Sequence, residues 1–557
     1  MRFWKGFLEK IGGYQKNGTN TFTGKARSAK DWQTLALQKL IALGTHLKLM
    51  LWDGGTYYDI TPIRLTATLG ANPFSMTNTS TSVSVTHTAH GGLAGDYVTY
   101  SGASAGGGIT INGEYTITSV TDADHYVITH SAPATSTTTG GGASVSAAYQ
   151  IHVGIAASLP GYGYGASTYG ASTYGTARST TNFLTLARLW SLDTWGEDLI
   201  ACPRDGGIYV WDATSGASTR AVVIGGTCPT TAKSVFVSEQ NRQLVVLGPD
   251  GDLLRVKWSA NEDYTDFTAT ASNTAGSKLL EGGTELLCAV KTKRETVIFT
   301  QSILWAMHFD GPPYTFSFEP MGSTNGIRGP HAAKEHDGKV YWMGKADFWV
   351  YDSAINLLTC DVLPTVFDDI DDTQGHLIYA GANQEKNEIW WLYPSNGASE
   401  CDRYVLFNVV DKTWAFGTLA RTVFVGDSKT FNNVYALGPD GYLYDHEYGV
   451  NADGAAINAY AETGDMEITP GDQVMIVDKV VPDFAELSGT LSLTLKGRKY
   501  PKGEQLSKGP YSVTSATEHL DVRITARQIA IKLEVSATDA NFRVGTLRIN
   551  VEPDGGR

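Results

Sequence analysis

One short pattern recurs along this sequence: an apolar run, an Asp-Gly pair and a second run rich in aromatic residues. Four copies have their turns at Asp205-Gly206, Asp250-Gly251, Asp337-Gly338 and Asp440-Gly441. The pattern predicts β-hairpins, because glycine adopts positive φ at no steric cost and aspartate can bond the nearby backbone. The turns are about 45, 87 and 103 residues apart, near one, two and two lengths of a propeller blade of about 45 residues. This spacing favours a β-propeller. An irregular all-β chain with ordinary hairpins is the alternative interpretation.

Strand pairs of this kind continue along the chain and predict six or seven blades. A tryptophan recurs in several of them, as expected where large aromatic side chains fill the wedge between neighbouring sheets. The tryptophans are Trp211, Trp258, Trp305, Trp349 and Trp391, and the strand pairs lie at 46–62, 199–212, 234–258, 295–309, 339–352, 388–414 and 434–447. We therefore expect a mainly β protein with a propeller body over 148–450.

The N-terminal segment, residues 1–68, is expected to be irregular up to about residue 27. Ser28 can cap a helix that has Trp32, Leu40 and Leu43 at roughly helical spacing, with Gly44 as its stop. The hairpin at 46–62 then begins the propeller.

Residues 69–147 differ in composition, since threonine, serine, glycine and alanine dominate and tryptophan is absent. Four alternating runs predict strands of one small β-domain inserted into a propeller loop. They lie at 81–87, 96–102, 114–120 and 125–131. Its histidines, His87, His90, His125 and His130, are too scattered to predict a metal site and fit an exposed β surface.

The segment 161–178, GYGYGASTYGASTYGTAR, has low complexity and regularly spaced tyrosines. Glycine and serine do not build a packed core, so the segment is either a surface linker or a loop that presents its tyrosines to a channel or a partner. Under the second interpretation the candidate channel-gating residues are Tyr162, Tyr164, Tyr169 and Tyr174.

Residues 451–557 contain alternating runs that predict a C-terminal antiparallel β-sandwich. Cationic residues concentrate here, and their alternation along strands indicates a solvated outer face rather than a phosphate site, with a subunit contact as the other interpretation. They are Arg523, Arg527, Lys532, Arg543 and Arg548.

Composition disfavours several classes of protein. A net charge of -14 disfavours a general nucleic-acid or anionic-membrane binder, although it suits a wall past which DNA slides. The five cysteines (Cys202, Cys228, Cys288, Cys360 and Cys401) have no CxxC spacing, so free thiols in a protein made in a reducing cytoplasm are expected. We expect no membrane span, because no run of about 18 apolar residues occurs.

The sequence also contains few reactive patterns. There is no GxSxG, HExxH, P-loop or dinucleotide fingerprint, and the acidic run 368–372 lacks the ligand pattern of a calcium loop. We therefore expect no enzyme, no catalytic residues, no cofactor and no metal. A glycosidase carboxylate pair stays open, because aspartate and glutamate are numerous.

Both ends of the chain suggest a family. Residues 21–32 and 41–64, together with 509–535 and 541–557, resemble the tail nozzle proteins of short-tailed bacteriophages. At the C-terminal end the match includes Gly509-Pro510-Tyr511, Arg523, Arg527-Gln528 and the run 543–546. The inserted segment is similar to small β modules of phage tail proteins, and the Gly/Tyr run to a repeat in the nozzle family.

The resemblance implies a structural virion protein of the phage tail. It implies a homohexameric ring below portal and adaptor that continues the DNA channel, retains the packaged genome and passes it during ejection. The implied partners are the adaptor (head-to-tail connector), tail fibres or spikes, and genomic DNA that passes through the lumen without sequence-specific binding. The competing interpretations are a receptor-binding or glycan-degrading propeller of a tail fibre or spike, and a propeller scaffold unrelated to virions.

Overall fold

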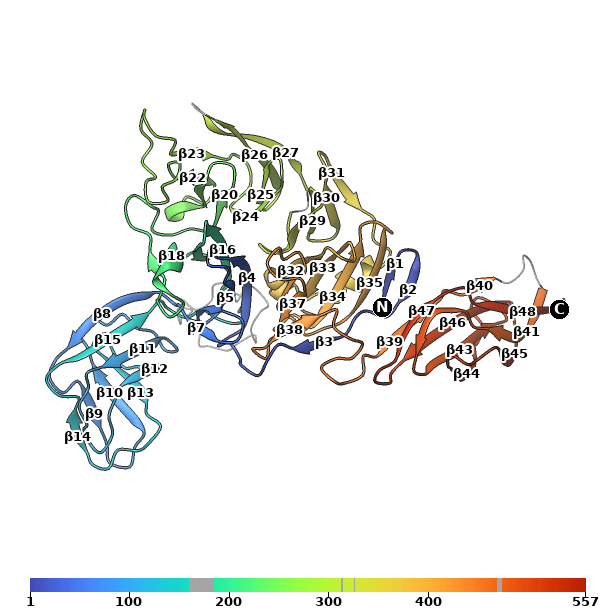
Figure 1. Ribbon diagram of the computed structural model, residues 1–557, viewed down its shortest axis with the longest axis horizontal. Coiled ribbons are helices and arrows are strands. Elements are labelled where there is room, and N and C mark those ends of the chain that lie inside the picture. The colour runs from blue at the N-terminus through green and yellow to red at the C-terminus, as the bar shows by residue number, and fades with distance from the viewer. Residues whose placement is uncertain (160–184, 312–313, 325, 468–472, 557) are drawn as a thin grey trace, which may run out of the picture. The chain divides into compact units, whose positions relative to one another are not determined.

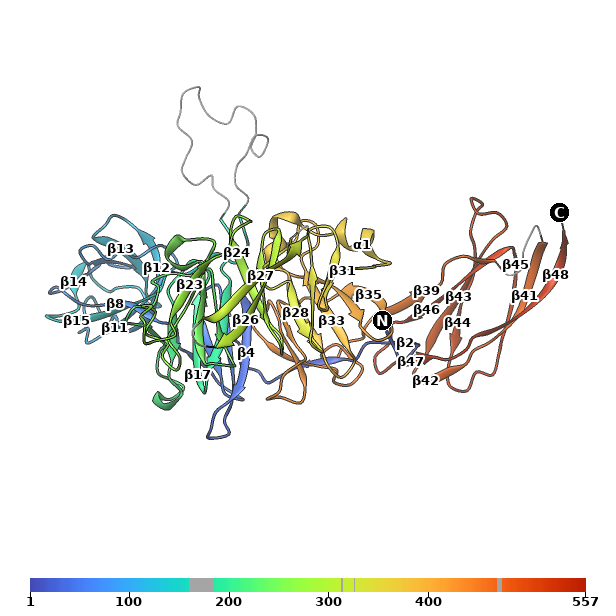
Figure 2. The same ribbon diagram turned by 90° about the horizontal axis from the view of Figure 1, so that it is seen from above.

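The computed structural model describes residues 1–159, 185–311, 314–324, 326–467 and 473–556. The chain forms two compact units, one of Met1–Thr19 with His331–Arg557 and the other of Asn20–Pro330 (Figures 1 and 2). Strands make up nearly all of the regular structure in both. Within the described part, the helical segments are α1 (Leu363–Phe367) and the short 3-10 turns η2 (Ala213–Ser215), η3 (Pro249–Gly251) and η4 (Asp372–Leu377).

The unit Asn20–Pro330 contains four consecutive four-stranded antiparallel meanders, in each of which the strands pair in chain order. This is the blade pattern of a β-propeller. The strands are β4 (Ala26–Gln33), β5 (Lys39–Thr45), β6 (Leu49–Trp52) and β7 (Tyr57–Asp59); β16 (Trp190–Trp195), β17 (Asp198–Pro203), β18 (Tyr209–Trp211) and β19 (Val222–Val223); β20 (Ser234–Ser238), β21 (Gln243–Leu247), β22 (Arg255–Trp258) and β23 (Gly276–Leu279); and β24 (Leu286–Lys291), β25 (Thr296–Thr300), β26 (Ile303–Gly311) and β27 (Thr315–Ser323).

The other unit adds three more such sheets, which brings the blades among the described residues to seven. The last of them takes its outer strand, β3 (Tyr14–Lys16), from the N-terminus of the chain. The others are β28 (Ala333–His336), β29 (Lys339–Met343), β30 (Phe348–Tyr351) and β31 (Ile355–Leu358); β32 (Tyr379–Asn383), β33 (Glu388–Tyr393), β34 (Arg403–Asn408) and β35 (Thr413–Thr418); and β36 (Val423–Val425), β37 (Val434–Leu437) and β38 (Leu443–His446). The β-propeller predicted from the hairpin pattern is confirmed.

The predicted Asp-Gly turns join strands of these blades. Asp337 and Gly338 have φ of 50° and 79° and form the two-residue turn between β28 and β29, the conformation that favours Asp-Gly. Trp211 and Trp391 are buried as expected, while Trp305 and Trp349 are half-buried.

The helix predicted over 28–44 is wrong, because these residues form the hairpin β4–β5, in which Asp31 pairs with Ile41. The run from Leu40 to Leu43 is buried on both faces, and on one of them Leu40 and Ala42 share an apolar cluster with Trp190 of the next blade. Consecutive apolar residues satisfy helical spacing as well as the needs of a central strand. Residues 1–27 are not irregular either, since they contain three short strands.

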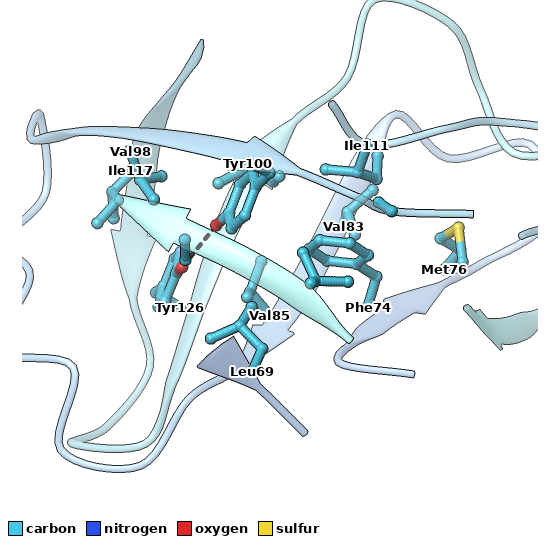
Figure 3. Close-up of a cluster of buried hydrophobic side chains, with 14 of the residues drawn as sticks. Leu69, Phe74, Met76, Val83, Val85, Val98, Tyr100, Ile111, Ile117 and Tyr126 are labelled. Carbon is cyan, nitrogen blue, oxygen red and sulfur yellow. Dashed lines mark hydrogen bonds between the residues drawn. The ribbon is translucent and has the colours of Figure 1, made fainter. Parts of the chain in front are cut away.

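The inserted β-domain is an eight-stranded antiparallel sheet in the order β14-β9-β10-β13-β12-β11-β15-β8. Its core is continuous, and the hydroxyls of Tyr100 and Tyr126 meet inside it at 2.5 Å (Figure 3). All four predicted strands are present. The strands are β8 (Ile63–Leu69), β9 (Phe74–Met76), β10 (Ser82–Thr86), β11 (Tyr97–Ser101), β12 (Gly113–Val120), β13 (His125–Thr129), β14 (Thr138–Gly140) and β15 (Val145–Gln150).

The C-terminal domain is a sandwich of antiparallel sheets around one apolar cluster, as predicted. A further sheet, β1-β2-β47-β42, combines two strands from each end of the chain. The strands are β1 (Arg2–Trp4), β2 (Phe7–Glu9), β39 (Ala459–Glu462), β40 (Met466–Glu467), β41 (Gln473–Val481), β42 (Phe484–Ser488), β43 (Leu491–Arg498), β44 (Leu506–Val513), β45 (Leu520–Ala526), β46 (Gln528–Val535), β47 (Asn541–Val544) and β48 (Arg548–Gly556).

Candidate functional site

A buried carboxylate connects the first strands of four consecutive blades. Asp193 on β16 is 3% exposed. Its Oδ2 accepts hydrogen bonds from the backbone N–H of Val237 on β20 and from Nζ of Lys291 on β24, both at 2.8 Å. Nζ of Lys30 on β4 lies 3.1 Å from the same carboxylate. One side chain therefore fixes the spacing of these four strands.

The charges of this cluster compensate one another. Burial acts to raise the pKa of Asp193, but the ammonium groups of Lys30 and Lys291 outweigh it and hold that pKa well below its ordinary value. The pKa of Lys291 is raised, because Asp193 and Glu239 oppose the effect of burial. The cluster is a satisfied structural ion group and offers no free base or acid.

A similar contact occurs in the other unit. Nζ of Lys334 on β28 lies 2.8 Å from Oδ2 of Asp427, which follows β36, and β32 belongs to the blade between these two. In each unit, ion pairs thus reach past an intervening blade. The first strands of neighbouring blades therefore lie so close together that side chains from the blades on either side of an intervening blade are in contact.

The N-terminus contributes a second ion cluster, which we call the N-terminal clamp: Arg2, Glu9, Glu388 and Glu447. The Arg2 side chain is fully buried, as is that of Glu388. Nη1 of Arg2 donates to Oε2 of Glu388 at 3.3 Å, Nη2 donates to Glu447, and Nε lies 4.0 Å from Glu9. The clamp therefore joins strands β1 and β2 to β33 and to the residue that follows β38.

Burial acts most strongly on Glu388 of the clamp, whereas the paired carboxylates outweigh burial at Arg2 and raise its pKa. Burial raises the pKa of Glu388 to about 7, although the Arg2 guanidinium opposes the shift. Nearby, Nε of Arg421 donates to Nε2 of His446 at 3.1 Å, which requires that nitrogen to be unprotonated. Burial and the Arg421 charge accordingly hold the pKa of His446 well below its ordinary value.

Lys10 extends the connection to the C-terminal domain. Its Nζ donates to the carbonyl oxygens of Ala540 at 2.6 Å and Val450 at 2.9 Å. Residues 2–16 thus contact the last two blades and the C-terminal domain. They supply strand β3 to the last blade and strands β1 and β2 to a sheet with β47 and β42.

A third cluster, the insert joint, attaches the inserted domain to its neighbouring blades. Nζ of Lys48 lies 2.9 Å from Oδ2 of Asp59 and 2.5 Å from Oε1 of Glu114 on β12. Arg220 donates to Asp59 at 3.2 Å, and Gln150 donates to Oε2 of Glu114 at 2.6 Å. The charges of this joint are also paired.

The candidate gating residues Tyr162, Tyr164, Tyr169 and Tyr174 lie outside the described residues, so the gating loop stays a prediction. The four histidines of the inserted domain make local hydrogen bonds: His87 meets the hydroxyl of Tyr149, for example, and His125 meets the Asp122 carboxylate. In the part of the chain that the structure describes, no three His, Cys, Asp or Glu side chains gather to hold a metal ion.

The acidic run 368–372 serves local structure. Asp371 caps η4 by accepting from the backbone N–H of Thr373 at 2.8 Å and also accepts from Gly397. Oδ2 of Asp369 lies 3.4 Å from Nε of Arg403. All five cysteines are free, and no helix among the described residues has the length and hydropathy to cross a membrane.

The cationic residues of the C-terminal domain separate into different roles. Lys532 lies in a charged ladder with Glu534 at 2.6 Å, and Arg548 lies 3.5 Å from Asp483. Arg527 lies over the ring of Tyr500, whereas Arg543 reaches Glu9 and the rings of β1 and β2. Sequence reasoning missed the clamp altogether. The one sequence signal of the clamp was Glu388, a charged residue at the start of a strongly apolar strand. That signal did not indicate that Arg2 is its partner.

No protein-family model matches the sequence, and no curated protein does so. Among solved structures, the phage phi92 endosialidase is similar over 91% of this chain and 69% of its own, with 10% identity and a TM-score of 0.22. The hydrazine synthase of Kuenenia stuttgartiensis is similar over 47% of this chain and 86% of its own, with 9% identity and a TM-score of 0.32. These values are too low to support an argument about this chain.

Proposed function

We propose that this protein is a structural subunit of a short-tailed bacteriophage tail, a nozzle protein whose copies form a hexameric ring around the DNA path. The N-terminal clamp is the observation that carries the proposal. A domain held to its neighbouring blades by a fully buried arginine and by shared strands resists displacement, as a wall under internal pressure must. The nozzle role and the hexameric state in this proposal rest on the sequence resemblance.

The proposal includes a route for the DNA. Asp193 and Lys291 meet from alternate blades, as do Lys334 and Asp427, and these contacts favour a passage enclosed by several copies over one through the blades of a single copy. The net charge of -14 suits a wall that repels phosphate. The adaptor above and fibres or spikes at the side are the proposed partners, and the virion is the proposed location.

The test is the native mass of the purified chain, alone and mixed with the adaptor of the same phage, followed by electron microscopy of the mixture. Six copies on the adaptor, enclosing a passage wider than duplex DNA, are expected. A trimer that does not bind the adaptor and that releases reducing sugar ends from host polysaccharide would overturn the proposal in favour of a glycan-degrading spike.

A further inference from the structure

The inserted domain has a hollow of about 500 Å³ on its surface, which we call the threonine hollow. It lies where β12 changes partner. The first half of β12 pairs with β11 (Tyr97 with Thr116), and the second half pairs with β13 from Ile117 onward. The hollow is lined by Asn112, Glu114, Tyr115, Thr116, Thr118, Thr129 and Ser131.

The lining is rich in hydroxyl groups that are available to a ligand. The side chains of Thr116, Thr118, Thr129 and Ser131 come from exposed residues, and the hydroxyls of Thr118 and Thr129 lie 3.0 Å apart. Within the described residues, no hydrogen bond engages the side-chain hydroxyl of Thr116, Ser131 or Tyr115. A hydroxyl both donates and accepts, so this surface can pair with either kind of polar group.

The charged groups at the hollow are already paired. Both carboxylate oxygens of Glu114 are held, one by Lys48 and the other by Gln150. Lys48 is also bound to Asp59, as is Arg220. Among the described residues that line the hollow, none therefore presents a free cation to a phosphate or carboxylate ligand, or a free carboxylate to an amine.

One aromatic ring adds an apolar surface of fixed orientation. Tyr115 is half-buried and stacks on His130 with ring centroids 6.1 Å apart and an interplanar angle of 25°. The ring of Tyr100 lies 5.9 Å from it on the core side. Burial raises the pKa of Tyr115, so its phenol keeps its proton.

We propose that the threonine hollow binds a neutral oligosaccharide. Its volume falls within the range of small-ligand sites, about 300–1,000 Å³. Hydroxyl groups on both partners supply matched donors and acceptors, while the tyrosine ring offers the apolar contact that a sugar ring accepts. The paired charges of the insert joint disfavour anionic sugars. The site concerns the inserted domain alone and does not depend on the nozzle assignment.

The test applies the full chain to a printed array of neutral oligosaccharides that also carries sialylated and sulfated members. We expect neutral members to be retained and the double variant Thr116→Val/Thr129→Val to bind them at least about tenfold more weakly, as the loss of two hydroxyl contacts implies. The matched control is Thr86→Val/Thr139→Val, two exposed threonines of the same domain that do not line the hollow, and it should bind normally.

Three results would overturn the proposal: retention of charged members alone, no retention of any neutral member, or equal binding by both double variants. The melting temperatures of both variants must match that of the wild type. If the first double variant unfolds early, Ser131→Ala replaces it in the same comparison.

Discussion

The C-terminal domain and the inserted domain are both additions to blades, and they are attached in different ways. The clamp at the C-terminal domain has Arg2 and Glu388 fully buried, whereas Asp59 and Glu114 of the insert joint are 19% and 32% exposed. The inserted domain is joined to the chain of the blades at both ends, since β8 follows the blade β4–β7 and β15 precedes the blade β16–β19. Strands β8 and β15 pair side by side. The C-terminal domain follows β38 by a single chain crossing. A domain connected to the blades by one chain crossing requires a strong non-covalent attachment. A domain connected by two crossings requires ion pairs mainly to set its orientation.

The largest expected effect is at the clamp. Arg2→Met leaves Glu388 and Glu447 without their cation, and removing one partner of a buried pair costs about 3–5 kcal/mol. Amide hydrogen exchange of β1 and β47 reports the free energy of local opening and should show this loss. Arg523→Ala, an exposed arginine of the same domain, is the control and should leave exchange unchanged. A change below about 1 kcal/mol in Arg2→Met would mean that the clamp does not hold the domain.

The insert joint should respond less. Lys48→Met removes the ammonium between Asp59 and Glu114, but Arg220 and solvent remain, so we expect a loss of about 2 kcal/mol in the local stability of β7 and β12. Lys278→Met, at an exposed lysine of β23, is the matched control. If exchange across the whole inserted core also accelerated, the joint would be stabilising the fold of the domain rather than its orientation.

The two attachments should depend on pH in opposite directions. The pKa of Glu388 is raised to about 7 from 4.5, so the folded clamp binds a proton more tightly than the unfolded chain. The contribution of this Glu388 pKa shift to stability is complete below pH 4.5 and is lost as pH rises through about 7. The pKa of Asp59 is lowered from 3.8, because Arg220 and Lys48 outweigh the opposing effect of burial. Its contribution is present above 3.8 and is lost as pH falls through its folded value.

Hydrogen exchange of β1 and β7 from about pH 3 to about pH 8, corrected for intrinsic rates, measures both effects. Because His446 near the clamp acts in the opposite sense to Glu388, the comparison is between wild type and Glu388→Gln, which should lack the opening of β1 that rises toward pH 7. The same slope in both proteins would assign the effect to another group.

How well the sequence predicted each region depends on how far apart in the sequence the interacting residues lie. The blades depend on local hairpins, so Asp337-Gly338 was sufficient to place a turn. The hairpin at 28–44 was predicted as a helix, because a fully buried strand lacks alternation. Strand β2 has three residues, and its partner Arg543 is more than 500 residues away. No local pattern indicates such a pairing, and so the clamp, which supports the proposed function best, could not be predicted.

The smallest expected effect concerns Arg543, where the attachment of the C-terminal domain reaches the surface. Its guanidinium lies 4.6 Å from the ring of Phe7, 5.2 Å from that of Trp4 and 3.7 Å from Glu9, and its side chain is 23% exposed. Arg543→Ala should weaken the β2–β47 contact by about 1 kcal/mol, the sum expected of a cation–π contact and a partly exposed ion pair. Arg543→Lys keeps the charge but loses the planar guanidinium. Its amide exchange rate in β47 should therefore fall between those of the wild type and of Arg543→Ala. If the alanine variant opened as readily as Arg2→Met, the strength of the attachment would lie at its rim and not in the buried clamp.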